Sequence, residues 1–528
     1  MDNFQVLPAF FILSSLILHA FGAALSNRCS HDTFAAIDIP EATVVNVAAT
    51  PVHDFSTSTV QNGDIPTANF TGLDFCNVTI TYSHGSDETN VQIWLPNSKE
   101  WNGRFQATGG GGYIAGYGPE ALTPAVAKGY VAACTDGGHA SNITDSWALI
   151  SEGQVNQVLL EDFASISLNE LASIGKSAIQ IFYLEAPTYS YFTGCSTGGR
   201  QGMMLAQRYP EAFDGILALA PAINWPAFQV ADYWGQHVMD KLGYYPEPCE
   251  LLSLTQEAIS ACDALDGVND GVISRPEICK FDATSIVGTN ITCNGTKTVR
   301  PEAAEIANAI WSGPITLTGQ RLWYGLNKDA PLTGLPRITP AETKCLSNGN
   351  CVGVPFSVSE EWIRLFVEKN SSFDVTTLSD QQYAGVFQRS AQEYDAIIGT
   401  ANPDLSAFRN AGGKILTWHG LADQLVAVGG TIQYYDQVTA LDPGGVDDYY
   451  RLYLAPGTTH CGAGTGPYPN DSLEVLVEWV EQGVAPDTLT ASAVNNEGQK
   501  VERELCLYPK EQTFVGGDPD VSSSFKCV

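Results

Sequence analysis

The stretch Tyr191-Phe-Thr-Gly-Cys-Ser-Thr-Gly-Gly-Arg200 decides how the rest of this chain is interpreted. Its centre, Gly194 to Gly198, has the G-x-S-x-G spacing of a nucleophilic serine on a tight turn between a strand and a helix. The flanking residues favour a strand before the turn and a helix from Arg200 to Arg208 after it. Glycines on both sides leave room for a turn that aims Ser196 outward. Because the pattern is common by chance, an ordinary serine in a glycine-rich turn is the alternative at this point.

The composition is typical of a well-buried globular protein. Of the 528 residues, 44% are hydrophobic and 16% are charged. The 58 acidic residues outnumber the 26 basic ones and give a net charge of −32. This charge argues against nucleic acids and anionic membranes as partners. The length allows two or three average domains, or one core with a large insertion.

The beginning of the chain indicates secretion. Residues 1–24 are predicted to be a signal peptide, because Val6 to Ala24 is apolar and ends in small residues. A membrane anchor is the alternative, but polar residues interrupt the segment and no basic cluster follows it. Seven N-x-[ST] sequons predict a glycoprotein. They lie at Asn69, Asn77, Asn142, Asn290, Asn294, Asn370 and Asn470.

The thirteen cysteines also favour an oxidising compartment. Their odd number leaves at least one thiol unpaired or paired between chains. Cys134 lies in an apolar run and is predicted to be a buried free thiol on a strand.

Strands and helices alternate up to residue 222, which predicts a mainly parallel sheet flanked by helices. From Ile223 to Asp404 the pattern changes to cysteines, prolines and irregular helices without clear βαβ units. The alternation resumes with a strand at Lys414–Trp418. We therefore predict an α/β-hydrolase core of residues 25–222 and 405–528, interrupted by a lid of residues 223–404.

A nucleophilic serine needs a base and an orienting carboxylate, and both candidates follow predicted strands. Asp423 comes after the strand at Lys414–Trp418, and His460 comes after the next strand. Loops at the carboxyl ends of neighbouring parallel strands meet at one edge of a sheet, and Ser, Asp, His is the order in α/β-hydrolases. Ser196, Asp423 and His460 are therefore the predicted catalytic residues. His419 precedes Asp423 on the same loop and is interpreted as structural.

A run of four glycines, Gly109–Gly112, follows a predicted strand. Such a loop lets backbone N–H groups approach a ligand closely, although a flexible connection is the common alternative. The predicted oxyanion donors are the N–H of Thr197 and one from this loop, Gly110 or Gly111.

Two cysteines flank the proposed catalytic residues. Cys195 precedes Ser196 and Cys461 follows His460, so the two lie near disulfide distance if serine and histidine meet. Two free buried thiols are the alternative. The Cys-Ser, Asp, His-Cys arrangement resembles the tannase/feruloyl esterase family of fungi and bacteria, whose mark is a bond between these cysteines. The resemblance covers nearly the whole mature chain and includes Gly194–Gly202, Asp136–His139, Pro403–Phe408 and His419–Asp423.

A second signal, Asp263-Ala-Leu-Asp-Gly-Val-Asn-Asp-Gly-Val-Ile273, lies in the predicted lid. Carboxylates among glycines suit calcium, although the spacing is not that of an EF-hand and an acidic turn is the alternative. The resemblance implies a structural calcium site formed by the side chains of Asp263, Asp266 and Asp270 and the carbonyls of Val268 and Val272.

The sequence supports the pairings of the remaining cysteines to different degrees. Cys262 and Cys279 flank the acidic turn and are predicted to close it. Proximity and the resemblance imply Cys29–Cys76 and Cys506–Cys527, and less strongly Cys345–Cys351. Cys249 and Cys293 have no predicted partner.

The resemblance implies a secreted carboxylic ester hydrolase that acts on small phenolic esters. Hydroxycinnamoyl esters, such as feruloylated plant cell-wall saccharides, and galloyl esters of tannins are the two alternatives. The chain has no paired basic residues for the lid processing of some fungal tannases, which favours a feruloyl esterase. A non-catalytic, calcium-dependent binding protein is the alternative of a different class, and the complete triad argues against it. Lid aromatics that could form an apolar pocket are Trp225, Phe228, Trp234, Tyr244, Trp311, Trp323 and Tyr324.

Overall fold

The computed structural model describes residues 28–528, apart from 64, 140–142, 294, 336–337, 348 and 495–497. The predicted signal peptide and the sequons at Asn142 and Asn294 lie outside the described residues. None of the helices formed by the described residues combines the length and hydrophobicity that a bilayer-spanning segment needs.

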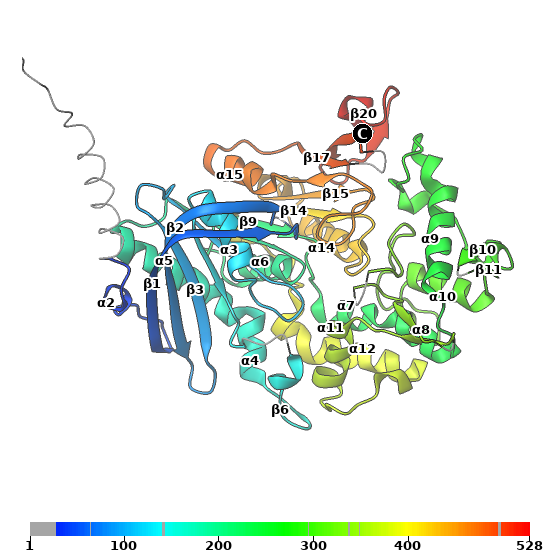
Figure 1. Cartoon of the computed structure of the whole chain (residues 1–528), viewed down its shortest axis with the longest axis horizontal. Coiled ribbons are helices and arrows are strands. Elements are labelled where there is room, and N and C mark those ends of the chain that lie inside the picture. The colour runs from blue at the N-terminus through cyan, green and yellow to red at the C-terminus, as the bar shows by residue number, and fades with distance from the viewer. Residues whose placement is uncertain are drawn as a thin grey trace, which may run out of the picture.

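A nine-stranded sheet organises the core (Figure 1). Its strands, in spatial order, are β1 (Thr43–Thr59), β2 (Ala68–Ser83), β3 (Thr89–Pro96), β5 (Val131–Thr135), β4 (Arg104–Thr108), β8 (Tyr189–Cys195), β9 (Gly215–Leu219), β14 (Lys414–Gly420) and β15 (Tyr450–Ala455). The six strands from β5 to β15 run parallel, and β1 to β3 form an antiparallel edge. The prediction of an α/β-hydrolase core with a mainly parallel sheet is confirmed.

Helices cover both faces of the parallel part of the sheet. They are α3 (Pro119–Ala127), α5 (Ser167–Tyr183), α6 (Thr197–Arg208), α14 (Val428–Leu441) and α15 (Ser472–Gln482). Neighbouring residues of one strand enter different cores: Phe192 packs with Met203 of α6, and Tyr191 packs with Trp479 of α15. Burial on both faces explains why β9, Gly-Ile-Leu-Ala-Leu, has no polar side chain.

The helical segment that leads to β8 contains a π-helical turn. The chain runs from α4 (Gln157–Glu161) through a π-helical turn at Asp162–Ile166 into α5. Sequence periodicity does not distinguish this wider turn from an α-helix.

The segment between β9 and β14 is mostly helical and lies to one side of the sheet (green to yellow in Figure 1). Its longer helices are α7 (Trp225–Asp232), α8 (Trp234–Leu242), α9 (Pro248–Cys262), α10 (Pro301–Ser312) and α12 (Asp380–Tyr394). The hairpins β10–β11 (Asn290–Cys293, Gly295–Thr298) and β12–β13 (Thr343–Cys345, Cys351–Gly353) complete it. An apolar cluster joins this segment to the core, because Tyr113 and Phe163 pack against Trp225. Its limits at residues 222 and 404 stay a prediction.

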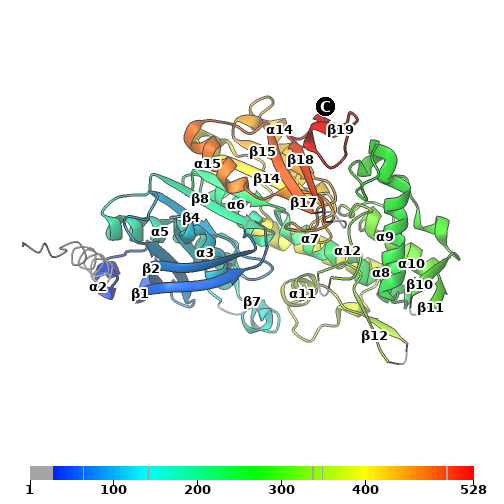
Figure 2. The ribbon, with the colours of Figure 1, turned by 45° about the horizontal axis from the view of Figure 1, so that its top comes forward.

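Small antiparallel sheets end the chain. They contain β16 (Tyr468–Pro469), β17 (Thr488–Val494) and β18 (Lys500–Cys506), and then β19 (Gln512–Phe514) and β20 (Phe525–Cys527). β18 lies beside β15, as Figure 2 shows.

The structure contains six disulfides among the described residues. They join Cys29–Cys76, Cys195–Cys461, Cys249–Cys293, Cys262–Cys279, Cys345–Cys351 and Cys506–Cys527. Every pairing expected from the sequence is present, and Cys249–Cys293 is the one that the sequence left open. Cys134 is free and buried on β5, as expected, and burial raises the pKa of its thiol to about 12.

Candidate active site

The serine turn has the strained backbone that its sequence predicts. Ser196 joins β8 to α6. Its backbone has φ 62° and ψ −120°, a conformation that residues other than glycine rarely adopt. The Ser196 N–H donates to the carbonyl of Leu219 on β9 at 3.0 Å. A Cβ atom at Gly194 would lie 2.7 Å from Gly198 Cα, so the turn requires glycine at that position.

Asp423 and His460 follow β14 and β15 and meet at the same edge of the sheet. His460 Nδ1 lies 2.8 Å from Asp423 Oδ2. Since a carboxylate only accepts hydrogen bonds, Nδ1 carries the proton, and Nε2 of the neutral ring is free to take another. Ser196 is half-buried, and the disulfide between Cys195 and Cys461, whose Cα atoms are 5.8 Å apart, joins the turn of Ser196 to the loop of His460.

Four donors fix the carboxylate of Asp423. Its Oδ1 accepts from the N–H groups of Leu425 and Val426 at 2.8 and 2.9 Å. Its Oδ2 accepts from His460 and also from Nε2 of His419 at 3.0 Å. The second contact of Nε2, at 3.1 Å, is the carbonyl of Val426, so this nitrogen of His419 also carries a proton.

His419 therefore belongs to the site, although its sequence position suggested only a structural part. Its ring is fully buried, and Nδ1 lies 2.9 Å from the hydroxyl of Thr431. The sequence could have indicated this role through the position of His419, near the end of β14 and four residues before Asp423. We describe it as a residue that positions the acid.

These contacts keep the acid ionised. Burial alone would raise the pKa of Asp423, but the charge of His460 and the hydrogen bonds from His419 and His460 outweigh it and hold the pKa well below its usual range. Asp232, at the end of α7, shows the opposite effect, since burial and the nearby charge of Asp423 raise its pKa well above normal. No motif in the sequence pointed to this second carboxyl.

A turn from the antiparallel edge covers the Cys195–Cys461 disulfide. The N–H of Gly63 donates to the carbonyl of Cys461 at 2.9 Å. A Cβ atom at Gly63 would lie only 2.7 Å from Cys195 Cβ, so a residue without a side chain is required here. The turn of Gly63 therefore packs directly against the disulfide.

The glycine loop lies against the start of α6. Thr197 Oγ1 donates to the carbonyl of Gly112 at 2.7 Å, and the Gly198 N–H donates to the carbonyl of Gly110 at 3.0 Å. The N–H of Gly110 already donates to Gln201 Oε1 at 3.2 Å. Of the two predicted loop donors, Gly111 is therefore the better candidate.

The predicted calcium ligands lie on one turn after α9. The two carboxylate oxygens of Asp263 accept from the N–H groups of Asp270 and Gly271, at 3.1 and 3.0 Å. Burial raises the pKa of Asp270, with contributions from the charges of Asp266 and Asp263, although Arg503 donates to it at 3.0 Å. Mutually repelling carboxylates suit a hard cation. In the described part of the chain these carboxylates are not gathered within 4.8 Å of one another, so joint coordination requires the turn to tighten.

Five of the seven lid aromatics lie in two places, and the other two, Tyr244 and Trp323, pack partly buried against the lid core. Trp225, Phe228 and Trp234 are buried in the hydrophobic core of the lid. Trp311 and Tyr324 line a cavity of about 410 Å³ at the boundary between lid and core, together with Leu421. Ser196 is not part of its wall.

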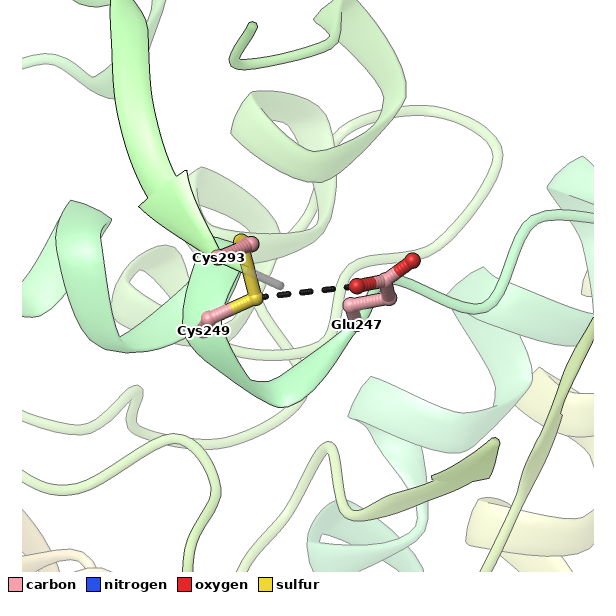
Figure 3. Close-up of side chains that lie close together, drawn as sticks. All are labelled: Glu247, Cys249 and Cys293. Atoms are coloured by element: carbon pink, nitrogen blue, oxygen red, sulfur yellow. Dashed lines mark hydrogen bonds between the residues drawn. A yellow bond between two sulfur atoms is a disulfide. The ribbon is translucent and has the colours of Figure 1, made fainter. Parts of the chain in front are cut away.

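Cys249 and Cys293 come close to Glu247, as Figure 3 shows. The distance from Cys249 Sγ to Glu247 Oε2 is 3.8 Å. Both sulfur atoms are consumed in the disulfide and carry no proton or thiolate charge. We exclude this group as a metal site.

The sheet order, the helices on both faces and the strained serine turn define the α/β-hydrolase class. Within that class the chain belongs to the tannase and feruloyl esterase family, whose sequence profile matches residues 76–528. Members of this family are carboxylic ester hydrolases.

Known proteins of this family resemble the chain over nearly its full length. A probable feruloyl esterase from Arthroderma benhamiae is 43% identical, over 88% of this chain and 87% of the relative. The solved structure of a tannin acyl hydrolase from Aspergillus niger has a TM-score of 0.85 at 30% identity, over 96% of this chain and 95% of that one. Feruloyl esterase B from Aspergillus oryzae has a TM-score of 0.77 at 26% identity, over 96% of this chain and all of that one (100%).

Proposed function

We propose that this protein is a secreted serine esterase that hydrolyses hydroxycinnamoyl esters, such as feruloyl groups on plant cell-wall saccharides. The observation that carries the proposal is the covalent link between the Ser196 turn and the His460 loop, made by Cys195–Cys461. The relative from Arthroderma benhamiae, a probable feruloyl esterase, supports the choice of acyl group.

The first step is acyl transfer to Ser196. His460 Nε2 takes the hydroxyl proton as Ser196 Oγ attacks the ester carbonyl, and Asp423 holds the ring through Nδ1. The N–H groups of Thr197 and Gly111 stabilise the oxyanion. The imidazolium then gives its proton to the leaving alcohol, and an acyl-enzyme remains.

Water completes the cycle. His460 deprotonates a water molecule that attacks the acyl carbonyl, and the acid product leaves as Ser196 recovers its proton. The depressed pKa of Asp423 keeps this carboxylate charged in acidic media, where it continues to hold the ring of His460.

A second substrate class, galloyl esters, is favoured by one specific observation. The tannin acyl hydrolase fits this fold with a higher TM-score than feruloyl esterase B does, 0.85 against 0.77. Turnover of methyl ferulate, methyl caffeate and methyl gallate distinguishes the two. We expect ferulate or caffeate to have the highest kcat/KM, and exclusive hydrolysis of gallate would refute the feruloyl assignment.

The proposal that the chain is an enzyme has a separate test. An organophosphonate should label one Ser196 per chain, and Ser196→Ala should abolish both labelling and turnover. A protein that folds, binds ferulate and yet fails to label would instead be the non-catalytic binding protein.

We further propose that the lid turn holds a structural calcium ion through Asp263, Asp266 and Asp270, with the carbonyls of Val268 and Val272. Its chemistry is charge neutralisation among the three carboxylates of this turn.

Secretion and glycosylation complete the proposal. Asn69, Asn290, Asn370 and Asn470 are exposed, as acceptors of glycans need to be, and Asn77 is half-buried. Mass spectrometry of the secreted protein before and after glycosidase treatment tests these sites.

A further inference from the structure

A cluster of ionisable side chains lies where the antiparallel edge meets α5. The turn between β2 and β3 supplies His84 and Asp87, the π-helical turn supplies Asp162, and α5 supplies Glu170. β3 runs antiparallel to β5, with Val91 beside Thr135. The turn before β3 therefore lies at the carboxyl ends of the parallel strands, where the Ser196 loop also lies. β5 and β4 lie between β3 and β8, which separates the cluster from the proposed active site.

The contacts within the cluster are short. His84 Nδ1 lies 2.8 Å from Asp87 Oδ2, and His84 Nε2 lies 2.7 Å from Glu170 Oε1. The second oxygen of Glu170 accepts from the hydroxyl of Tyr82 at 2.7 Å. Asp87 also accepts from the backbone N–H of His84.

Asp162 completes the group without a partner of its own. It is only 1% exposed, and its Oδ2 has no hydrogen-bond partner among the described residues. Ligand atoms of His84, Asp87 and Asp162 all lie within 4.8 Å of one another. The buried Oδ2 of Asp162 therefore offers lone pairs that no described residue uses, beside an imidazole and a second carboxylate.

We propose that His84, Asp87 and Asp162 form a binding site for a divalent transition-metal ion such as Zn²⁺. An imidazole nitrogen with two carboxylates is a common ligand set for zinc, whereas calcium and magnesium prefer oxygen alone. The side chain of His84 is 21% exposed and those of its partners are nearly buried, so the ion has a way in past His84.

The ion takes the place of the proton that His84 Nδ1 shares with Asp87, and that proton leaves to solvent. Two ligands of a tetrahedral zinc ion are about 3.3 Å apart, so the present 2.8 Å separation has to open by about half an ångström. His84 Nε2–H continues to donate to Glu170, which is the outer contact that metal-bound histidines usually make.

The site also has a structural consequence. Phe163 and Ala164, which follow Asp162, accept hydrogen bonds from the guanidinium of Arg200 on α6 at 3.1 and 2.9 Å. A bound ion therefore fastens the turn that supports the helix behind Ser196. We expect zinc to raise the unfolding temperature.

The test uses the full chain with calcium kept at saturation, so that the lid turn does not compete. Zinc chloride is titrated by calorimetry, and bound metal is counted after gel filtration. We expect one zinc per chain and a rise in Tm of about 2–5 °C at saturation. Asp162→Asn should weaken binding at least about 10-fold. The matched control is Asp329→Asn, which alters another buried carboxyl that belongs to no group of potential metal ligands among the described residues and should leave zinc binding unchanged.

Two results would overturn the proposal: no stoichiometric zinc on the wild-type chain, or equal affinity in wild type and Asp162→Asn. If Asp162→Asn does not fold, the wild-type protein still decides. X-ray absorption of its zinc should show one imidazole among oxygen ligands, and a sulfur ligand or two imidazoles would refute this site. Zinc held by His460 instead would inhibit ester hydrolysis, which the proposed site does not.

Discussion

Removal of the disulfide beside the nucleophile is expected to reduce turnover far more than substrate binding. The change is Cys195→Ala with Cys461→Ala, because either single replacement leaves a reactive thiol next to the site. The bond links residues 266 positions apart with Cα atoms 5.8 Å from each other. For a loop of that length, the chain-entropy relation gives about 5.5 kcal/mol of stabilisation. Three disulfides inside the loop already shorten it, so this figure is an upper limit.

The catalytic effect is estimated separately. A displacement of about 1 Å between reacting groups can lower the rate about 100-fold. We therefore expect kcat on methyl ferulate to fall about 100-fold with KM changed less than about 3-fold. Phosphonate titration gives the concentration of folded sites, so that lost activity is not confused with unfolding.

The matched control is Cys249→Ala with Cys293→Ala in the lid. That bond spans 44 positions, and the same relation gives about 4 kcal/mol. The two variants should therefore differ little in stability and strongly in kcat. Full kcat in the Cys195/Cys461 double variant, or an equal loss in the control, would refute the claim that this bond holds the Ser–His geometry.

Three further predictions concern the acid, the lid and pH. His419→Gln should lower kcat about 10–100-fold with little change in KM, because Asp423 loses one of its four donors; unchanged kcat would show that the other three suffice. Chelation of calcium should lower Tm by several degrees in the wild type but not in Asp266→Asn, as measured by calorimetry. Folding raises the pKa of a buried carboxyl such as that of Asp232, so its contribution to the free energy of unfolding is complete at a pH below the pKa in the unfolded state. The contribution is lost as the pH rises through the pKa in the folded state. The total loss is about 1.4 kcal/mol for each unit between the two pKa values. Asp232→Asn should therefore raise Tm more at pH 8 than at pH 5, and an equal change at both would contradict the raised pKa.

Features encoded in short segments were predictable from the sequence. The Ser196 turn has a local glycine signature, and the strand predicted at Lys414–Trp418 is β14, which ends two residues later. The Asp423 and His460 loops follow from strand order, since parallel strands place their carboxyl ends together. The Cys195–Cys461 pair follows from the same argument.

What the sequence did not show depends on contacts between distant segments. Cys249 begins a helix and Cys293 ends a hairpin strand, so neither position indicates the other. His84 and Glu170 are 86 positions apart and meet because β3, which follows the turn of His84, packs against α5. Trp225 is aromatic and near the site in sequence, but the tertiary fold buries it in the lid core.

The disulfide at the serine turn also determines what a cut in the lid would do. Cys195 precedes the whole inserted segment and Cys461 follows it, and Cys249–Cys293 and Cys345–Cys351 close loops inside it. A protease that cleaves between residues 294 and 344 would therefore yield two polypeptides that stay joined under oxidising conditions and separate only on reduction. The two parts of the core would stay in register after the cut, because β9 pairs with β14 and the disulfide joins Cys195 to Cys461. A nicked, two-chain enzyme would then retain the same Ser196 and His460 neighbourhood as the intact chain.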